Sequence, residues 1–273
     1  MIKGTIIISV YKNIRNLDLI FNALTIQTFK DFEAIVSDDG SGEEMNKFIS
    51  EWKQKHSLLI KHVWQEDSGF RKNRILNESI RKSDTDYLIF IDGDCIPHSE
   101  FIEAHISNRE NNTALFGRRV YLGEDNSLSL TEDKILSRKY EKINLNILKE
   151  SLTKKEKGSC NAEEGIIIKN KTVRKLFLKE DVGILGSNFS LHKSLIEKIN
   201  GFDENFIGPG YGEDTDVERR LRLFGAKIKS IRNLAVQYHL YHKKTVESSG
   251  NRDYYKKIKD DRNYFCINGL IKK

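Results

Sequence analysis

The sequence predicts an α/β protein built on an open, mainly parallel sheet with helices on both faces and a helical tail. Short apolar runs alternate with segments of helical periodicity along the first hundred residues, which is typical of βαβ units. Acidic turns directly follow two of these runs. Because such sheets bind ligands at the carboxyl ends of their strands, the acidic turns mark the expected binding edge.

The elements of the first half follow from the spacing of apolar residues. Four apolar runs are expected to form strands, at residues 5–10, 32–37, 58–64 and 87–91. Three segments between them carry apolar residues at helical spacing, at residues 16–28, 43–55 and 68–81. In the less regular second half, we expect helices at residues 100–109, 131–150, 191–200 and 213–224, with a polar loop at 154–161. Gly225 stands where a helix C-cap is expected.

Composition and charge limit the class of protein. The chain has 273 residues and a formal charge of +6, and basic proteins bind nucleic acids, nucleotides, anionic acceptors or membrane surfaces. An RNA-binding aromatic signature and a helix-turn-helix pattern are both missing, so a nucleic-acid partner is not expected. The sequence shows no eighteen-residue apolar run and no signal-peptide pattern, and its three cysteines suit a reducing compartment. We therefore expect a cytoplasmic protein.

Asp92, Gly93 and Asp94 are the most informative residues. They follow the apolar run at residues 87–91, so two carboxylates one residue apart leave a buried strand. The carboxylates cannot both point into a core, and unpaired they would repel each other. A divalent cation removes this conflict, and hard cations prefer carboxylate oxygens. A metal that also touches a diphosphate would let this turn hold a nucleotide.

Two further segments fit a nucleotide site. Asp38 and Asp39 follow the second strand, where a carboxylate can accept hydrogen bonds from a base or ribose, although a plain turn with a helix cap would use the same residues. A polar loop containing Gly69 then opens a helix with Arg71, Lys72 and Arg74 in its first turns. The helix dipole disfavours cations there. The three cations make sense if they meet an anion such as a pyrophosphate. The alternative is that they are ordinary basic residues of the surface.

The segment at residues 208–216 combines three glycines, Tyr211 and three acidic residues. An acidic helix N-terminus would explain the carboxylates by the dipole alone. An aromatic ring in a glycine-rich loop is also a natural platform for a sugar, and a nearby carboxylate can take a hydroxyl proton. Further on, His239 and His242 lie three residues apart and can share one metal ion if the backbone bends suitably.

These segments together resemble a known family. The chain looks like a GT-A glycosyltransferase of family 2, of the bacterial polysaccharide or lipopolysaccharide type whose C-terminal half is similar to the β-1,4-galactosyltransferases. The matching motifs occur in the family's order, at residues 8–13, 36–41, 65–71, 90–94, 186–188, 210–214 and 239–242. The resemblance implies a Rossmann-like GT-A domain at residues 1–242. Its nucleotide-binding half would be residues 1–97 and its acceptor half 98–242, with a basic insertion at about 149–179 and a basic helical tail at 243–273.

The resemblance also implies a role for each matching residue on the donor side. Asp39 would bind the uracil or ribose with Asp38 in support, and Asp92 would contact the ribose or the metal. The remaining residues of the expected nucleotide-sugar site are Val10, Tyr11, Gly69, Arg71, Arg74, Gly93, Gly186 and Asn188.

On the acceptor side, Asp214 would be the catalytic base and Glu213 would hold sugar hydroxyls. Tyr211 and Gly212 would contact the acceptor, and Tyr211 stands where galactosyltransferase-like members often carry Trp. Asp94 and His242 would ligate Mn²⁺ or Mg²⁺ together with His239, which falls where some relatives use Met.

The expected reaction is inverting transfer of a hexose or N-acetylhexosamine, with galactose types favoured, from a UDP-sugar to a saccharide or lipid-linked saccharide. The basic tail is a candidate for peripheral contact with the inner face of the plasma membrane. Two other classes stay open. A sugar-phosphate nucleotidyltransferase would need a basic, glycine-rich phosphate loop where this chain has Tyr11, Lys12 and Asn13. A catalytically silent binding module would release no UDP.

Overall fold

The computed structural model describes residues 2–142, 145–154, 156–177, 183–210, 212–243 and 247–272. The first part of the chain forms β1 (Gly4–Val10), α1 (Ile14–Thr25), β2 (Phe32–Asp38), α2 (Glu43–Lys55), β3 (Ile60–Trp64), α3 (Lys72–Lys82), β4 (Tyr87–Asp92), β5 (Cys95–Pro97) and α4 (Phe101–Ser107). The second part forms β6 (Thr113–Phe116), β7 (Arg118–Tyr121), α5 (Glu124–Leu128), α6 (Glu132–Leu136), η1 (Lys139–Glu141), α7 (Leu145–Thr153), η2 (Ala162–Gly165), α8 (Lys171–Phe177), β8 (Phe189–His192), α9 (Lys193–Lys198), α10 (Glu213–Phe224), β9 (Lys227–Ser230), β10 (Val236–His239) and α11 (Ser249–Ile258).

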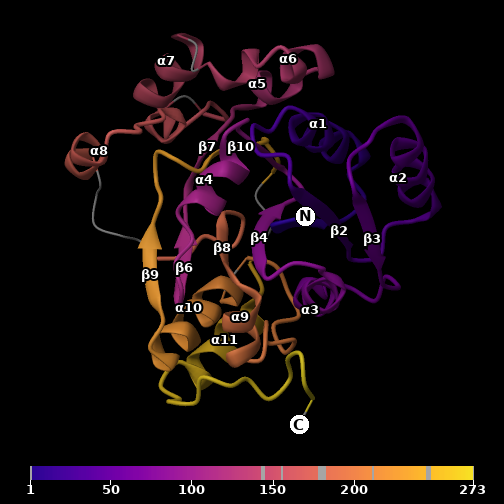
Figure 1. The fold of residues 1–273 in the computed structure, drawn as a ribbon, viewed down its shortest axis with the longest axis vertical. Coiled ribbons are helices and arrows are strands. Elements are labelled where there is room, and N and C mark those ends of the chain that lie inside the picture. The colour runs from indigo at the N-terminus through magenta and orange to yellow at the C-terminus, as the bar shows by residue number, and fades with distance from the viewer. Residues whose placement is uncertain are drawn as a thin grey trace.

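A seven-stranded sheet in the order β3-β2-β1-β4-β8-β6-β9 forms the centre of the fold (Figure 1). Strands β3, β2, β1 and β4 pair in parallel, while β8 runs antiparallel to both β4 and β6, and β9 is parallel to β6. Only β8 therefore reverses the common direction within this sheet. The prediction of an open, mainly parallel α/β sheet is confirmed.

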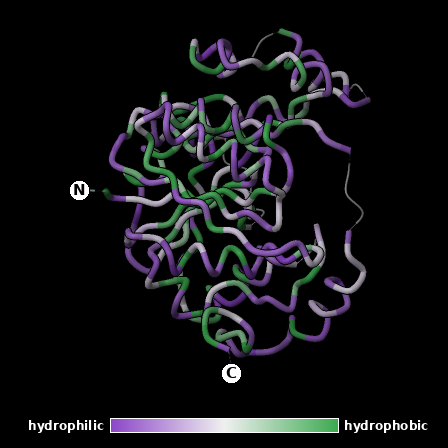
Figure 2. Tube along the Cα trace, turned by 90° about the vertical axis from the view of Figure 1, so that its right-hand side faces the viewer, coloured by the Kyte–Doolittle hydropathy of each residue, from purple (hydrophilic) through white to green (hydrophobic). Residues whose placement is uncertain are grey.

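Helices cover both faces of the sheet, and alternate residues of each strand point to opposite faces. Ile6 and Ile8 of β1 pack with the buried faces of α1, α2 and α4, whereas Ile7 packs with those of α3, α9 and α10. Figure 2 shows hydrophobic segments concentrated in the interior and hydrophilic ones toward the outside. The sheet is thus buried on both faces between two apolar cores, which hold its strands and the turns at their carboxyl ends in place.

Three short strands form a second, separate sheet in the order β5-β10-β7. Strand β5 starts three residues after the end of β4 and pairs antiparallel with β10, with Cys95 opposite His239. The backbone N–H of Leu240 donates to the carbonyl of Asp94 at 2.8 Å. This pairing brings a turn of the first half next to a strand that lies 140 residues further along.

Several expected helices differ in the structure: the helix expected at residues 68–81 begins only at Lys72, and the helix expected at residues 16–28 spans Ile14–Thr25. Residues 131–150 do not form one helix: α6 ends at Leu136, Arg138 adopts a left-handed conformation with φ 57°, and the chain continues through η1 before α7. Tyr140 explains the break, because its buried ring and its hydroxyl bond to the Pro97 carbonyl draw the chain inward. Residues 191–192 belong to β8 rather than to the next helix, since they pair with β4.

The tail contains helix α11 and then returns to the body of the protein. Asn200 donates to the carbonyl oxygens of Cys266 and Ile271, and it accepts from the Ile271 N–H.

The Lys-rich stretch at residues 149–179 contains the end of α7, η2 and α8, and it lies partly outside the described residues. Every helix in the described ranges falls short of the length and apolar character that crossing a bilayer requires.

Candidate active site

A cleft of about 690 Å³ opens at the carboxyl ends of β1, β2 and β4. The fold brings eleven of the sequence-predicted residues to its lining: Val10, Tyr11, Asp39, Gly69, Asp92, Gly93, Asp94, Gly186, Glu213, Asp214 and His242. They come from both halves of the chain. The acidic turns and the start of α10 therefore share one cavity, as the strand directions require.

Asp39 lines the cleft and is only 7% exposed. The backbone N–H of Arg71 donates to its Oδ2 at 2.8 Å, and the amide of Gln65 donates to its Oδ1. Burial raises the pKa of Asp39, although these two hydrogen bonds oppose that rise. A buried carboxylate held in one orientation at the cleft wall is suited to accept a hydrogen bond from a ligand.

Asp38 is fully buried and does not line the cleft. Its Oδ1 accepts from the Ser41 N–H at 2.8 Å, and its Oδ2 lies 2.9 Å from Nε2 of His62. These bonds shape the turn that presents Asp39, which fits the supporting role expected for Asp38.

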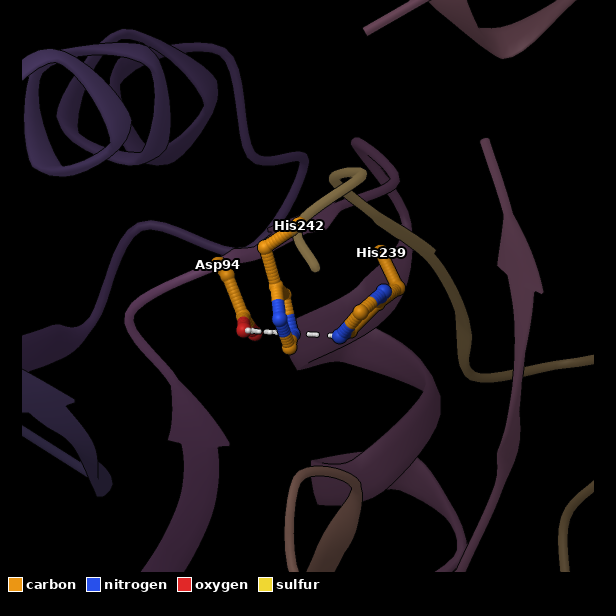
Figure 3. A group of neighbouring side chains, drawn as sticks. All are labelled: Asp94, His239 and His242. Atoms are coloured by element: carbon orange, nitrogen blue, oxygen red, sulfur yellow. Dashed lines mark ion pairs between the residues drawn. The ribbon is translucent and has the colours of Figure 1, made fainter. Parts of the chain in front are cut away.

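Asp94, His239 and His242 form the candidate metal centre. Figure 3 shows the three side chains converging, with Nε2 of His239 3.4 Å and Nε2 of His242 3.3 Å from Oδ2 of Asp94. One ligand atom from each residue lies within 4.8 Å of the others. Nδ1 of His242 lies 2.8 Å from the Lys243 carbonyl, so the other ring nitrogen, Nε2, faces Asp94 and can serve as the metal ligand. The donor set of one carboxylate and two imidazoles fits a divalent cation.

The charges in this cluster support that reading. Burial favours the neutral form of Asp94, but hydrogen bonds from His239 and His242 hold its pKa well below the usual range. The bond to Asp94 raises the pKa of His242. Asp94 is therefore an anion at neutral pH, and a cation bound there would take the place of the imidazole protons.

Asp214 and Glu213 occupy the first turn of α10 and line the cleft. Oδ2 of Asp214 accepts from the Gly186 N–H at 3.0 Å, and its Oδ1 accepts from the Thr215 N–H at 2.8 Å. A Cβ at position 186 would lie 3.3 Å from Cβ of Asp214, so a glycine there allows this close approach. The carboxylate of Asp214 is thus oriented and open to the cavity.

Several predicted residues lie elsewhere. Arg71, Arg74, Asn188, Gly212 and His239 are absent from the described lining of the cleft. Arg74 is exposed, and a guanidinium nitrogen of Arg71 donates to the Glu66 carbonyl. Asn188 is fully buried and donates to the carbonyls of Arg118 and Ala235.

Tyr211 lies outside the described residues. The roles assigned to all of these residues stay predictions.

Comparison with known proteins gives the family. A model described as glycosyl transferase family 2 matches residues 5–177, and one described as the N-terminal domain of galactosyltransferase matches residues 177–243. The chain belongs to glycosyltransferase family 2. The resemblance inferred from the motifs is therefore confirmed.

Among the relatives of this family 2 protein, the chondroitin synthases of Pasteurella multocida (strain Pm70) and Escherichia coli are each 26% identical, over 80% and 86% of this chain. The hyaluronan synthase of Pasteurella multocida is 25% identical over 78% of it. The matched regions cover only 22%, 34% and 22% of these three proteins, so the chain spans about a fifth to a third of their length.

Solved structures support the GT-A fold of this family 2 protein. GalNAc-T7 with UDP, GalNAc and Mn²⁺ matches with a TM-score of 0.61 at 11% identity, covering 96% of this chain and 49% of that one. Residues 1–349 of Staphylococcus aureus TarS in complex with UDP match with a TM-score of 0.57 at 16% identity, covering 93% of this chain and 63% of that one. At these identities the likeness establishes the fold alone.

Lys72 and Arg119 line the cleft of this glycosyltransferase. Lys72 was one of the three cations expected to meet an anion, although it was given no role in the site, and Arg119 was not predicted. Lys72 contacts both Asp92 and Glu213, at 2.8 and 2.7 Å. A sequence signal for Lys72 existed, because it lies one helical turn before the buried Ile75 on the sheet-facing side of α3. Arg119 donates to the Ser187 hydroxyl at 3.0 Å. It lies on β7, a strand that the periodicity did not reveal.

Proposed function

We propose that the protein transfers a hexose or N-acetylhexosamine, with galactose types favoured, from a UDP-sugar to a saccharide hydroxyl, with inversion and with a divalent metal. The observation that carries the proposal is the convergence of Asp94, His239 and His242, because Asp94 and His242 line the same cleft as Asp214. The names of the relatives, two of them chondroitin synthases and one a hyaluronan synthase, support a role in building a bacterial surface polysaccharide.

The donor would lie along the carboxyl ends of β1, β2 and β4. Asp39 would accept a hydrogen bond from the uracil or ribose, and Asp92, fixed by the Ser9 hydroxyl at 2.9 Å, would contact the ribose. TarS has been solved with UDP and with UDP-GlcNAc, and PcManGT from Pyrobaculum calidifontis with GDP-Man and Mn²⁺. The uridine preference therefore rests on the motif resemblance, and comparing UDP with GDP binding tests it.

Asp94, His239 and His242 would hold the metal, and two imidazoles favour Mn²⁺ over Mg²⁺, which takes oxygen ligands almost alone. When bound, the ion would supply Lewis-acid stabilisation of the departing diphosphate. Lys72 and Arg119 also line the cleft, and their positive charges would further stabilise the departing diphosphate.

In the transfer step, the hydroxyl oxygen of the acceptor attacks C1 of the donor sugar, and a carboxylate oxygen of Asp214 takes the hydroxyl proton. The bond between C1 and the diphosphate oxygen breaks, and UDP leaves with the electron pair. Attack from the face opposite UDP inverts the configuration at C1. Glu213 would hold sugar hydroxyls, and its bond to Lys72 keeps its carboxylate in place.

Substituting Asp214→Asn tests the base assignment, because the amide keeps the shape of the side chain and cannot accept the proton. We expect transfer to fall by at least about a hundredfold while Mn²⁺-dependent UDP binding persists. Asp133→Asn, in the exposed first turn of α6, is the matched control. Turnover of the Asp214→Asn protein close to that of the control would place the base elsewhere.

A further inference from the structure

Helix α11 (Ser249–Ile258) lies beyond residue 243, where the second family match ends. In Figure 1 it lies at the lower end of the molecule, where the C-terminal segment returns. Its inner side contacts the loop at residues 203–210, which leads into α10 and its two cleft carboxylates. The contacts between this helix and this loop suggest a role that the family motifs do not describe.

The N-terminal end of α11 holds the loop through its backbone. The amide of Asn251 donates to the Gly208 carbonyl at 2.6 Å, and Asn251 is only 1% exposed. The Ser248 N–H donates to the Pro209 carbonyl at 3.0 Å. The Ser248 hydroxyl in turn caps the helix by accepting from the Asn251 N–H. Pro209 and Gly210 line the cleft, so these bonds fix part of its rim.

One turn further on, Tyr254 holds the beginning of the same loop. Its hydroxyl donates to Oδ2 of Asp203 at 2.7 Å and accepts from the Asn205 amide at 3.1 Å. Its ring packs edge-on against Phe206, with centroids 5.1 Å apart and planes at 78°. A single side chain thus restrains three residues of the loop through two hydrogen bonds and one aromatic contact.

Phe206 passes this restraint to the start of α10. Gly212, the N-cap of α10, has a φ of 96°, and a Cβ there would lie 2.5 Å from the Phe206 ring. The ring therefore packs directly on the backbone that precedes Glu213 and Asp214. Among the described residues, Phe206 and Gly212 thus link Tyr254 to the two carboxylates.

We propose that α11 is a positioning element for the acceptor side of the cleft, with Asn251 and Tyr254 as its positioning residues. This rests on the proposed function, since it assumes that the acceptor sits between this rim and Asp214. Asp39 and Asp94, the residues proposed for the donor and the metal, follow β2 and β4 and are not part of the loop that α11 holds. Loosening α11 should therefore weaken acceptor use much more than donor binding or donor hydrolysis.

Tyr254→Phe tests the proposal because it removes the hydroxyl bonds and keeps the ring against Phe206. Asn251→Ala is a second variant that breaks the bond to Gly208. The matched control is Tyr264→Phe, the same change in a tail tyrosine whose ring packs on Phe224. For each protein, hydrogen exchange at residues 203–210, UDP release without acceptor, and the acceptor KM are measured on the full chain.

We expect faster exchange at residues 203–210 in both test variants, and an acceptor KM raised about fivefold, which is the effect of about one lost hydrogen bond. UDP release without acceptor should match the control. Unchanged exchange in this loop would overturn the proposal, as would equal losses of hydrolysis and transfer. If the unmodified protein releases no UDP from any donor, the proposed function fails, and exchange at the loop alone decides whether α11 holds it.

Discussion

The ammonium of Lys72 lies 2.7 Å from Oε1 of Glu213, although 141 residues separate the two in the sequence. The same ammonium lies 2.8 Å from Oδ1 of Asp92. Burial lowers the pKa of Lys72, but the two carboxylates outweigh this and raise it. Burial raises the pKa of Glu213, and Lys72 opposes that rise. One cation therefore joins the end of β4 to the start of α10 and keeps two carboxylates at short range in one cleft.

Replacing Lys72 should lower both the stability of the protein and its turnover of UDP-sugars. In Lys72→Met, Asp92 and Glu213 would face each other without their shared cation, so the free energy of unfolding should fall by about 2 kcal/mol. UDP-sugar turnover should fall by at least about tenfold, since the wall of the cleft loses a positive charge. Urea denaturation and UDP release measure the two effects.

Lys82→Met is the control for that change, because Lys82 is an exposed residue in the last turn of the same helix. The control should behave like the unmodified protein. Equal stability and turnover in Lys72→Met and Lys82→Met would show that the bridge between Asp92 and Glu213 contributes to neither.

Removing a metal ligand should greatly reduce the response of the protein to Mn²⁺. A ligand that binds only the folded state raises the unfolding temperature as its concentration increases. We expect Mn²⁺ to raise the unfolding temperature of the unmodified protein, and His242→Ala to lose most of that rise. His192→Ala, outside the cluster, should keep it. An equal rise in all three proteins would place the ion at another site.

The first half of the fold was predictable because local patterns determine it. The expected helix at residues 43–55 matches α2, and the four expected strands match β1 to β4 within about two residues. The helix expected at residues 131–150 failed because the burial of Tyr140 outweighs the local preference for helix. Strands β5 to β10 are only three or four residues long. Periodicity is weak evidence over so short a run.

His105 gives a pH-dependent contribution to stability. It is fully buried, with ring nitrogens 2.7 Å from the Ser190 hydroxyl and 3.1 Å from Oδ1 of Asn188, and burial lowers its pKa to about 3 from 6.5. Between these values the unfolded chain binds a proton that the folded protein does not. Its contribution to stability should therefore fall by about 1.4 kcal/mol for each pH unit below about 6.5.

The comparison of His105→Gln with the exposed-histidine control His56→Gln isolates this effect. His105→Gln should be less stable near neutral pH, and its stability should fall less steeply as the pH drops. Urea denaturation at several pH values between about 7 and 5 measures the slopes. Parallel slopes for the two variants would exclude His105 as the source.

Peripheral membrane contact through the tail stays a prediction, and α11 defines how to test it. Its inner residues hold the loop at 203–210, whereas Lys256 and Lys257 are exposed. Reversing both charges should reduce pelleting with anionic liposomes by about an order of magnitude if the lysines face an anionic membrane. The same reversal at Lys53 and Lys55, at the end of α2, is the control. Equal pelleting of the two double variants would remove the tail from membrane binding.

The candidate site was predictable where chemistry is concentrated in short motifs. Asp39, Asp94 and Asp214 follow strands or begin a helix, and each lies in the cleft. Arg119 was not predictable, because its position depends on the pairing of β7 with β10, 118 residues further along. Among the cations at the start of α3, the choice of Lys72 required the direction of each side chain, which residue type alone does not give.

Release of UDP from a panel of UDP-sugars, measured with Mn²⁺ and again with EDTA, tests the proposed function most directly. We expect slow acceptor-independent release from one UDP-sugar with Mn²⁺ and loss of that release with EDTA, which would establish the donor and the need for metal together. Failure to release UDP from every sugar, together with no binding of UDP itself, would contradict the assignment of the cleft to a uridine nucleotide.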